Sequence, residues 1–209
     1  MELAPYGDLC DLLLSKKIEM NDQLARTFFH QLVAGLEYLH SMGVAHLDLK
    51  CDNLLLGEDY TLKICDFDQA YIKGQGRILS SGTENFRAPE IAQHSCKIPE
   101  AADIYSLGII LFVMKSGGNF PFMETGQGMD FYSLLKRQPE LFWKKHTEIL
   151  KKDDSFFDEG FKNLFLSLTS LKSDTRLSIE QIKMSRWYTE PIYTQNEVKE
   201  IFKDYLRSN

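Results

Sequence analysis

The chain has 209 residues, of which 44% are hydrophobic and 26% are charged, and its formal net charge is −6 at pH 7. This composition is that of an ordinary soluble globular protein, and the length suits one domain or one large lobe. The acidic balance argues against nucleic acid or an anionic membrane as the main partner.

The cysteines and the amino terminus indicate the compartment. The opening MELAPYGDLC has neither the positive nor the apolar region of a signal peptide, and no apolar run approaches the ~18 residues of a membrane span. The sequence therefore predicts a cytoplasmic or nuclear protein. The cysteines are spread out without a C-x-x-C pair, as free thiols would be; they are Cys10, Cys51, Cys65 and Cys96.

Two helices are expected first. Residues 8–17 place leucines on one face of a short helix, and residues 21–42 carry apolar side chains at spacings of three and four, the pattern of an amphipathic helix. Asn21 or Asp22 can cap the second helix, and Gly43 can close it in the left-handed conformation. The apolar positions of the second helix are Leu24, Phe28, Leu32, Leu36 and Leu39.

A hairpin with polar ends is predicted next, in residues 46–68 (HLDLKCDNLLLGEDYTLKICDFD). An apolar run follows Asn53, residues 57–60 resemble a turn, and a second strand ends at Asp66. Because a hairpin brings its ends together, Asp48, Asn53 and Asp66 are expected to converge. Three oxygen-bearing side chains at one point can position a hydroxyl group and hold Mg²⁺.

The rest of the chain is predicted to be helical, apart from a loop over residues 69–98. Residues 103–114 are apolar almost all round, the pattern of a buried helix, and Gly117-Gly118 ends it. Asp174 and Ser178 are candidate helix caps. The expected fold is mostly α with a small β-hairpin. The remaining helical segments are 131–136, 140–150, 158–171, 178–184 and 194–206.

These motifs resemble those of protein kinases. Residues 46–68 are similar to H-R-D-L-x-x-x-N followed by D-F-G, and residues 82–90 (GTENFRAPE) to G-T-x-x-[YF]-x-A-P-E. Residues 103–108 (DIYSLG) resemble the D-x-W-S-x-G helix, and Arg176 stands where the family places the partner of its A-P-E glutamate. The resemblance implies the carboxy-terminal lobe of a serine/threonine kinase of the calcium/calmodulin-dependent-like group.

The resemblance implies ATP and Mg²⁺ as cofactors and a protein or peptide substrate with a Ser or Thr hydroxyl. Asp48 would be the catalytic base, Lys50 would neutralise the γ-phosphate, and Asn53 and Asp66 would hold Mg²⁺. Outside such a motif, an aspartate like Asp48 is more often a cap and a lysine like Lys50 a solvated charge.

Nucleotide contacts are also implied. The backbone at Glu2 and Ala4 would bond the adenine edge, and Leu55 would lie under the base. Asp8 would face the ribose or a basic substrate residue, which Asp52 could also meet. Cys65 would line the nucleotide pocket, although a small core residue is the alternative interpretation.

Other residues are expected to support the site. His46 would pack on Phe67, and the hydroxyl of Thr83 would bridge Asp48 and Lys50. Asp103 would accept backbone amides of the catalytic loop. Glu90 and Arg176 would form a buried ion pair.

Two substitutions depart from the family pattern. Leu47 replaces the arginine of H-R-D, which predicts a kinase that phosphorylation of Ser80 or Ser81 does not switch. Asp68 replaces the glycine of D-F-G, where an aspartate tolerates glycine's backbone angles poorly and adds repulsion near Asp66, or else joins the metal shell.

The larger departure concerns the amino-terminal lobe. No glycine-rich phosphate loop, V-A-I-K lysine or αC glutamate occurs in the sequence. Residues 1–190 are therefore interpreted as a hinge plus carboxy-terminal lobe, and residues 191–209 as a helical extension. Three alternatives stay open: a kinase whose upstream part is not included, a pseudokinase or isolated lobe acting as a binding module, and a lobe completed by another polypeptide. The sequence predicts no oligomeric state.

Overall fold

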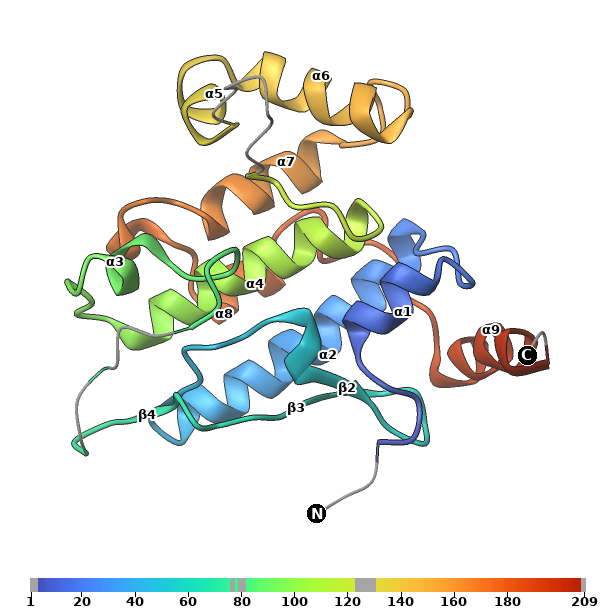
Figure 1. The fold of residues 1–209 in the computed structure, drawn as a ribbon, viewed down its shortest axis with the longest axis horizontal. Helices are drawn as coiled ribbons and strands as arrows, with labels where there is room; N and C mark the ends of the chain where they lie inside the picture. The colour runs from blue at the N-terminus through green and yellow to red at the C-terminus, as the bar shows by residue number, and fades with distance from the viewer. Residues whose placement is uncertain (1–3, 76–77, 79–81, 123–130, 208–209) are drawn as a thin grey trace.

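The computed structural model describes residues 4–75, 78, 82–122 and 131–207. Over these ranges the protein is mostly helical, with two small two-stranded antiparallel sheets, as the sequence predicts. Figure 1 shows the long helices α2 and α4 through the middle of the molecule, the strands along one side of α2, and α5 and α6 at the opposite end. None of the described helices is both long enough and apolar enough to cross a bilayer.

The first two helices match their predicted segments. Helix α1 (Leu9–Ser15) is capped by Asp8, whose carboxylate accepts the N–H of Asp11. Helix α2 (Asp22–Ser41) is capped by Asn21, and Gly43 follows it with φ 72°. The apolar face of α2 is buried at Leu24, Phe28, Leu32 and Leu36.

The predicted hairpin is present. Strands β2 (Leu54–Leu56) and β3 (Leu62–Ile64) pair antiparallel, with Leu54 opposite Ile64. The short 3₁₀ helix η1 (Cys51–Asn53) leads into β2.

Two short elements were missed in the segment predicted to be a loop. Strand β4 (Tyr71–Ile72) pairs with β1 (Val44–Ala45), and α3 (Pro89–Ala92) is a single helical turn. Elements of two to four residues are too short to show a period of 2.0 or 3.6, so the interpretation of residues 69–98 as unbroken loop was wrong.

Helix α4 (Pro99–Lys115) is the buried centre of the molecule and starts four residues before the predicted segment. Pro99 stands in its first turn, where the missing N–H costs nothing. Gly108 lets α7 approach closely, because a Cβ at this position would lie 2.8 Å from side-chain atoms of Leu168 and Thr169.

The carboxy-terminal half contains α5 (Phe131–Arg137), α6 (Pro139–Leu150), α7 (Glu159–Leu168), η2 (Ser173–Thr175), α8 (Ile179–Lys183) and α9 (Gln195–Arg207). Ser178 caps α8 in a capping box with Gln181, as predicted for Ser178. Asp174 was wrongly predicted as a cap, because it lies inside η2. Helix α7 ends at Leu168 rather than at 171.

Candidate active site

The loop that carries the candidate catalytic residues is fastened to α4 by Asp103. Its fully buried carboxylate accepts the N–H groups of His46 and Leu47, each at 2.8 Å. His40 Nε2 lies 2.9 Å from the same carboxylate. A buried carboxylate is costly unless it is hydrogen-bonded, and these donors satisfy it while fixing the loop.

Leu47 adopts a left-handed backbone conformation, with φ 63°. A bulky residue with positive φ is unusual and persists only where its surroundings hold it. The hydrogen bond to Asp103 supplies that restraint, and the Leu47 side chain is buried in the core, 6% exposed. The loop therefore presents an apolar residue inward where kinases of the H-R-D type carry a cation.

Asp48 is held at both carboxylate oxygens. Oδ1 accepts the backbone N–H of Thr83 at 2.7 Å and its hydroxyl at 3.0 Å. Oδ2 lies 3.2 Å from Lys50 Nζ and 3.5 Å from Asn53 Nδ2. The predicted contact of Thr83 with Asp48 is present, whereas the described residues show no hydrogen bond between Thr83 and Lys50. Asp48 is thus a nearly buried carboxylate with fixed orientation.

Asn53 and Asp66 are brought together through the hairpin. The N–H of Cys65 donates to the Asn53 carbonyl at 3.0 Å, which places Asp66 one residue beyond this link. His46 Nε2 donates to the Cys65 carbonyl at 2.9 Å, and the His46 ring lies 5.0 Å from that of Phe67. The predicted contact of His46 with Phe67 is therefore present.

Asn53 and Asp66 fit a Mg²⁺ ion. Asn53 Nδ2 donates to the Asp48 carbonyl at 3.0 Å, which leaves the amide oxygen as an acceptor. The exposed Asp66 carboxylate has no hydrogen bond or ion pair within the described ranges, and its backbone φ of 64° turns it out of the strand. The described residues contain no group of three or more His, Cys, Asp and Glu that could hold a metal. Two oxygen ligands suit Mg²⁺, which usually keeps several waters and binds phosphate oxygens.

Several of the candidate nucleotide-binding residues lie close together. Asp8 forms a bridge with Leu55, and the N–H of Leu56 donates to the Gly7 carbonyl at 2.9 Å. Burial raises the pKa of the Cys65 thiol, and Asp66 and Asp8 raise it further, so Asp8, Cys65 and Asp66 share one region. Ala4 is half-buried at the start of this segment.

Some expected residues lie outside the described ranges or behave differently. Glu2, Ser80 and Ser81 are outside the described residues. Asp68 is exposed and does not adopt positive φ, so the expected backbone strain at this position was wrong. The left-handed conformation belongs instead to Asp66, two residues earlier.

The predicted ion pair between Glu90 and Arg176 is present and buried. Two guanidinium nitrogens of Arg176 donate to the two carboxylate oxygens at 2.5 and 2.8 Å. Arg176 also donates to the carbonyls of Ala101 and Ser170, at 2.7 and 2.8 Å. One side chain thus joins α3, α4 and the turn after α7.

Two contacts that hold residues 82–90 in place were not predicted from the sequence. The hydroxyl of Ser106 donates to the Phe86 carbonyl at 2.8 Å. Gly82 has φ 101°, and a Cβ there would lie 2.9 Å from the Leu47 carbonyl oxygen. Ser106 and Gly82 both belong to recognised motifs, but only the tertiary contact gives each its role.

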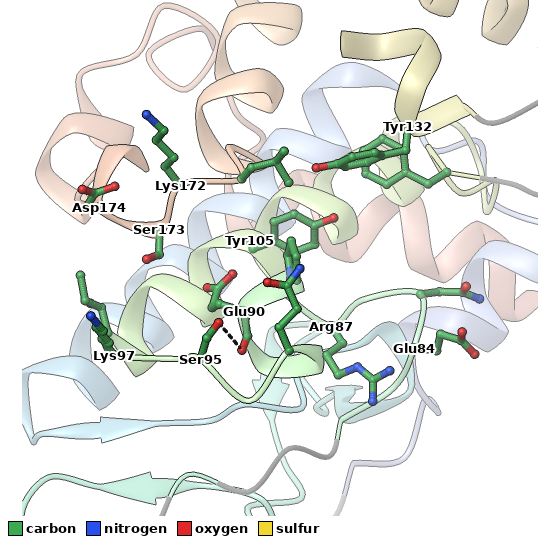
Figure 2. Close-up of a pocket in the computed structure, with 16 residues that line it drawn as sticks. Glu84, Arg87, Glu90, Ser95, Lys97, Tyr105, Tyr132, Lys172, Ser173 and Asp174 are labelled. Atoms are coloured by element: carbon green, nitrogen blue, oxygen red, sulfur yellow. Dashed lines mark hydrogen bonds between the residues drawn. The ribbon is translucent and has the colours of Figure 1, made fainter.

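A hollow of about 1130 Å³ lies beside this segment, between residues 84–98 and the turn 171–174. Figure 2 shows Glu90 in it, with the hydroxyl of Ser95 bonded to the Glu90 carbonyl. No residue of the Asp48 group lines it, so the hollow is separate from the candidate catalytic residues. The aromatic residues that line it are Tyr105, Phe122 and Tyr132.

Comparison with known proteins gives a consistent result. A family model described as "Protein kinase domain" matches residues 1–188. CBL-interacting serine/threonine-protein kinase 8 of Arabidopsis thaliana is 34% identical over 191 residues, which cover 90% of this chain and 40% of that protein. Testis-specific serine/threonine-protein kinase 2 of Mus musculus is 31% identical over 198 residues, 91% of this chain and 52% of that protein. The chain spans about half or less of the length of these relatives.

Proposed function

The chain belongs to the protein kinase domain family, and from that premise we propose that it forms the substrate-positioning part of a serine/threonine kinase. The reaction would transfer the γ-phosphoryl group of ATP to a Ser or Thr hydroxyl of a protein or peptide. The observation that carries the proposal is the Asp48 carboxylate, with Oδ1 held by Thr83 and Oδ2 beside Lys50. Such a fixed carboxylate suits a base that orients an attacking hydroxyl group.

Each residue of the group has a chemical role in this proposal. Asp48 accepts the hydroxyl proton as the substrate oxygen bonds to the γ-phosphorus and the bond to the β–γ bridging oxygen breaks. Lys50 offsets charge on the transferred group. Asn53 and Asp66 would hold Mg²⁺, which when bound would supply charge neutralisation on the phosphates. Phosphoryl transfer depends mainly on positioning and electrostatics, which explains why fixed side chains are needed here.

ATP is proposed to lie along the segment that leads into α1. Leu55 would contact the adenine, Asp8 the ribose, and Cys65 the pocket wall. Asp8 already caps α1 through one carboxylate oxygen, which leaves the other for a ligand. The backbone at Glu2 and Ala4 is proposed for the adenine edge.

The substrate is proposed to carry a basic residue near its hydroxyl group. Burial raises the pKa of Cys10, and Asp52, Asp8 and Asp11 raise it further, in that order. These three carboxylates therefore gather around one thiol and create a local negative potential. A Lys or Arg side chain of the substrate would be attracted to it.

The domain boundaries stay a prediction. We propose that residues 1–190 are a hinge plus carboxy-terminal lobe and that residues 191–209 are a helical extension. The phosphate-covering loop and the β3 lysine of kinases do not occur in this sequence. We therefore expect this chain by itself to turn over weakly or not at all, and place full activity in the whole protein.

The test compares Asp48→Ala with Asp154→Ala, an exposed aspartate outside the site. Transfer of ³²P from MgATP to a Ser-containing basic peptide is measured in the whole protein. We expect Asp48→Ala to reduce kcat by about 10²–10⁴-fold, the usual contribution of a positioned acid–base residue. Equal rates in the two variants would refute the role of Asp48.

A second candidate function is a binding module without chemistry, which the buried Leu47 and the additional carboxylate of Asp68 favour. It predicts that wild-type protein transfers no phosphate, although its partner still binds. Isothermal titration with MgATP separates the two: binding that Asp66→Ala weakens supports the kinase, and no binding at millimolar MgATP supports the module.

A further inference from the structure

Helix α9 lies beyond the part of the chain that the kinase family matches, residues 1–188. It nevertheless packs closely against the rest of the molecule, with Val198 and Phe202 0% and 1% exposed. Figure 1 shows α9 beside the turn of the β2–β3 hairpin, on the same side of the molecule as α1. A helix outside the matched family domain therefore packs beside the hairpin whose strand β2 contains the candidate nucleotide residue Leu55.

Aromatic rings connect α9 to the hairpin turn, to α2 and to the segment before α1. The ring of Phe202 stacks on Tyr60 of the hairpin turn with centroids 4.6 Å apart, and Tyr60 stacks on Tyr6 at the same distance. On its other side Phe202 meets the buried ring of Phe28 in α2, edge to face at 6.3 Å. This ring column, Phe28–Phe202–Tyr60–Tyr6, runs from the core helix to the segment before α1.

Tyr60 combines these ring contacts with a left-handed backbone conformation in the hairpin turn. It has φ 61°, which is strained for a bulky residue and persists only where neighbours enforce it. The turn's own backbone hydrogen bonds hold it: the N–H of Tyr60 donates to the Gly57 carbonyl and the N–H of Gly57 to the Thr61 carbonyl. Two contacts from α9 add to this restraint, namely the Phe202 ring on Tyr60 and the Gln195 side chain, which donates to the Asp59 carbonyl. Burial raises the pKa of Tyr60 to about 12, and the neighbouring Tyr6 side chain raises the pKa as well.

Tyr6 leads directly to the candidate nucleotide residues. Its N–H donates to the Leu56 carbonyl at 3.4 Å, and the N–H of Leu56 donates to the Gly7 carbonyl at 2.9 Å. The next pair along this short ladder is Asp8 and Leu55. The 3.4 Å bond is long and weak, so the backbone alone holds Tyr6 loosely.

We propose that α9 positions the nucleotide-binding segment through this ring column, with Phe202 and Tyr60 as positioning residues. Phe202 holds Tyr60 in its strained turn, and Tyr60 holds Tyr6 against β2. The register of Asp8 and Leu55 then depends on a helix far along the chain. The positioning of the segment rests on the structure alone, whereas its consequence for ATP rests on the proposed function.

The test uses Phe202→Ala in the full chain, with Lys203→Ala as the control. Lys203 is the exposed neighbour on the same helix and pairs only with Glu200 among the described residues. Amide hydrogen exchange is followed at Tyr6 and Leu56 and compared with Ile110 in α4, without nucleotide. We expect Phe202→Ala to speed local exchange at Tyr6 and Leu56 about three- to tenfold, the size of one lost aromatic pair, whereas exchange at Ile110 reports separately the loss of global stability.

Two further variants keep the proposal falsifiable if Phe202→Ala does not fold. Tyr60→Leu removes the ring that stacks on Tyr6 but keeps an apolar side chain, and Gln195→Ala removes the contact with the Asp59 carbonyl. Both variants should speed exchange at Tyr6, Gln195→Ala by the smaller factor. Unchanged exchange at Tyr6 in folded variants overturns the proposal. Equal acceleration at Tyr6 and Ile110 also overturns it, because the effect is then global.

A second readout concerns the nucleotide. In the whole protein, Phe202→Ala should raise the KM for MgATP while leaving the KM for the basic peptide unchanged. A rise in both constants contradicts positioning of the nucleotide segment. If wild-type protein neither binds nor turns over MgATP, the proposed function fails, yet the exchange result at Tyr6 still decides whether α9 positions the segment.

Discussion

Leu47 combines a left-handed backbone with a buried apolar side chain, and this combination limits which residues can replace it. We predict that Leu47→Arg lowers the free energy of unfolding by about 1–3 kcal/mol, because it forces a guanidinium group into an apolar pocket. Urea denaturation measures the loss, with Leu47→Met as the volume-conserving control. Equal stability of the Arg variant and wild type would show that the side chain can leave the core.

His146 is a buried histidine in α6 surrounded by aromatic rings. Its Nε2 donates to the Pro121 carbonyl at 2.9 Å, its Nδ1 has no partner within the described residues, and burial lowers its pKa to about 4. The unfolded chain therefore binds the proton more tightly than the folded chain. This destabilising effect is absent above the unfolded pKa of 6.5 and grows as the pH falls towards 4.

We predict that the protein loses about 3 kcal/mol of stability from His146 between pH 6.5 and 4. The variant His146→Phe removes the titrating group and fills the aromatic cluster, so its stability should fall less steeply over this range. Urea unfolding at several pH values gives the slope. The same slope in wild type and His146→Phe would mean that His146 takes up its proton equally in both states.

At the scale of elements, the Arg176 side chain joins α3, α4 and the turn that follows α7. Arg176 binds Glu90 in α3 and the Ala101 carbonyl in α4, from the turn before α8. We predict that Arg176→Met costs about 3–5 kcal/mol, because it leaves the Glu90 carboxylate buried without a partner. The double variant Glu90→Met with Arg176→Met should recover much of this loss, and thermal unfolding of the four proteins measures the coupling.

How well each element could be predicted depended on its length and on whether its signal was local. Helix α2 was found because its 20 residues display a period, and α4 because a long segment is apolar on every side. Their caps and glycines are local signals. Strand β4 and helix α3 were missed because neither is long enough to repeat a pattern. The order of Asp48, Asn53 and Asp66 along the hairpin predicted that they lie near one another, and the structure shows Asn53 hydrogen-bonded to Asp48 and to the N–H of Cys65, next to Asp66.

Across the whole molecule, the contacts that sequence could not predict join segments far apart in the chain. The ring column links residues 6, 28, 60 and 202, and each ring alone reads as an ordinary apolar position. Arg26 of α2 is another case: it is buried and donates to the carbonyls of Trp187 and Pro191 and to the Glu190 carboxylate. Such partners follow from packing, which a single sequence with no repeat or motif at these positions does not reveal.

The Arg26 hydrogen bonds and the ring column attach different parts of the carboxy-terminal segment, so we expect different results when each is lost. Arg26 fastens residues 187–191, so a protein that ends after residue 192 keeps this attachment and loses only the part that carries α9. The loss uncovers Phe28 and Tyr60, which Phe202 covers in the complete chain. Removing α9 should therefore destabilise the domain without unfolding it.

We predict that truncation after residue 192 lowers the free energy of unfolding by about 3–5 kcal/mol, the sum expected for exposing the sites of one Phe and one Val. Urea denaturation measures the loss, and Lys203→Ala in the untruncated chain controls for changes on the solvent side of α9. Val198 and Phe202 are the residues of α9 known to be buried, so the double variant Val198→Ala with Phe202→Ala should reproduce most of the effect of truncation. A truncated chain as stable as the complete one would show that α9 is an appendage, and a double variant that loses much less than the truncation would place the stabilising contacts elsewhere on the helix.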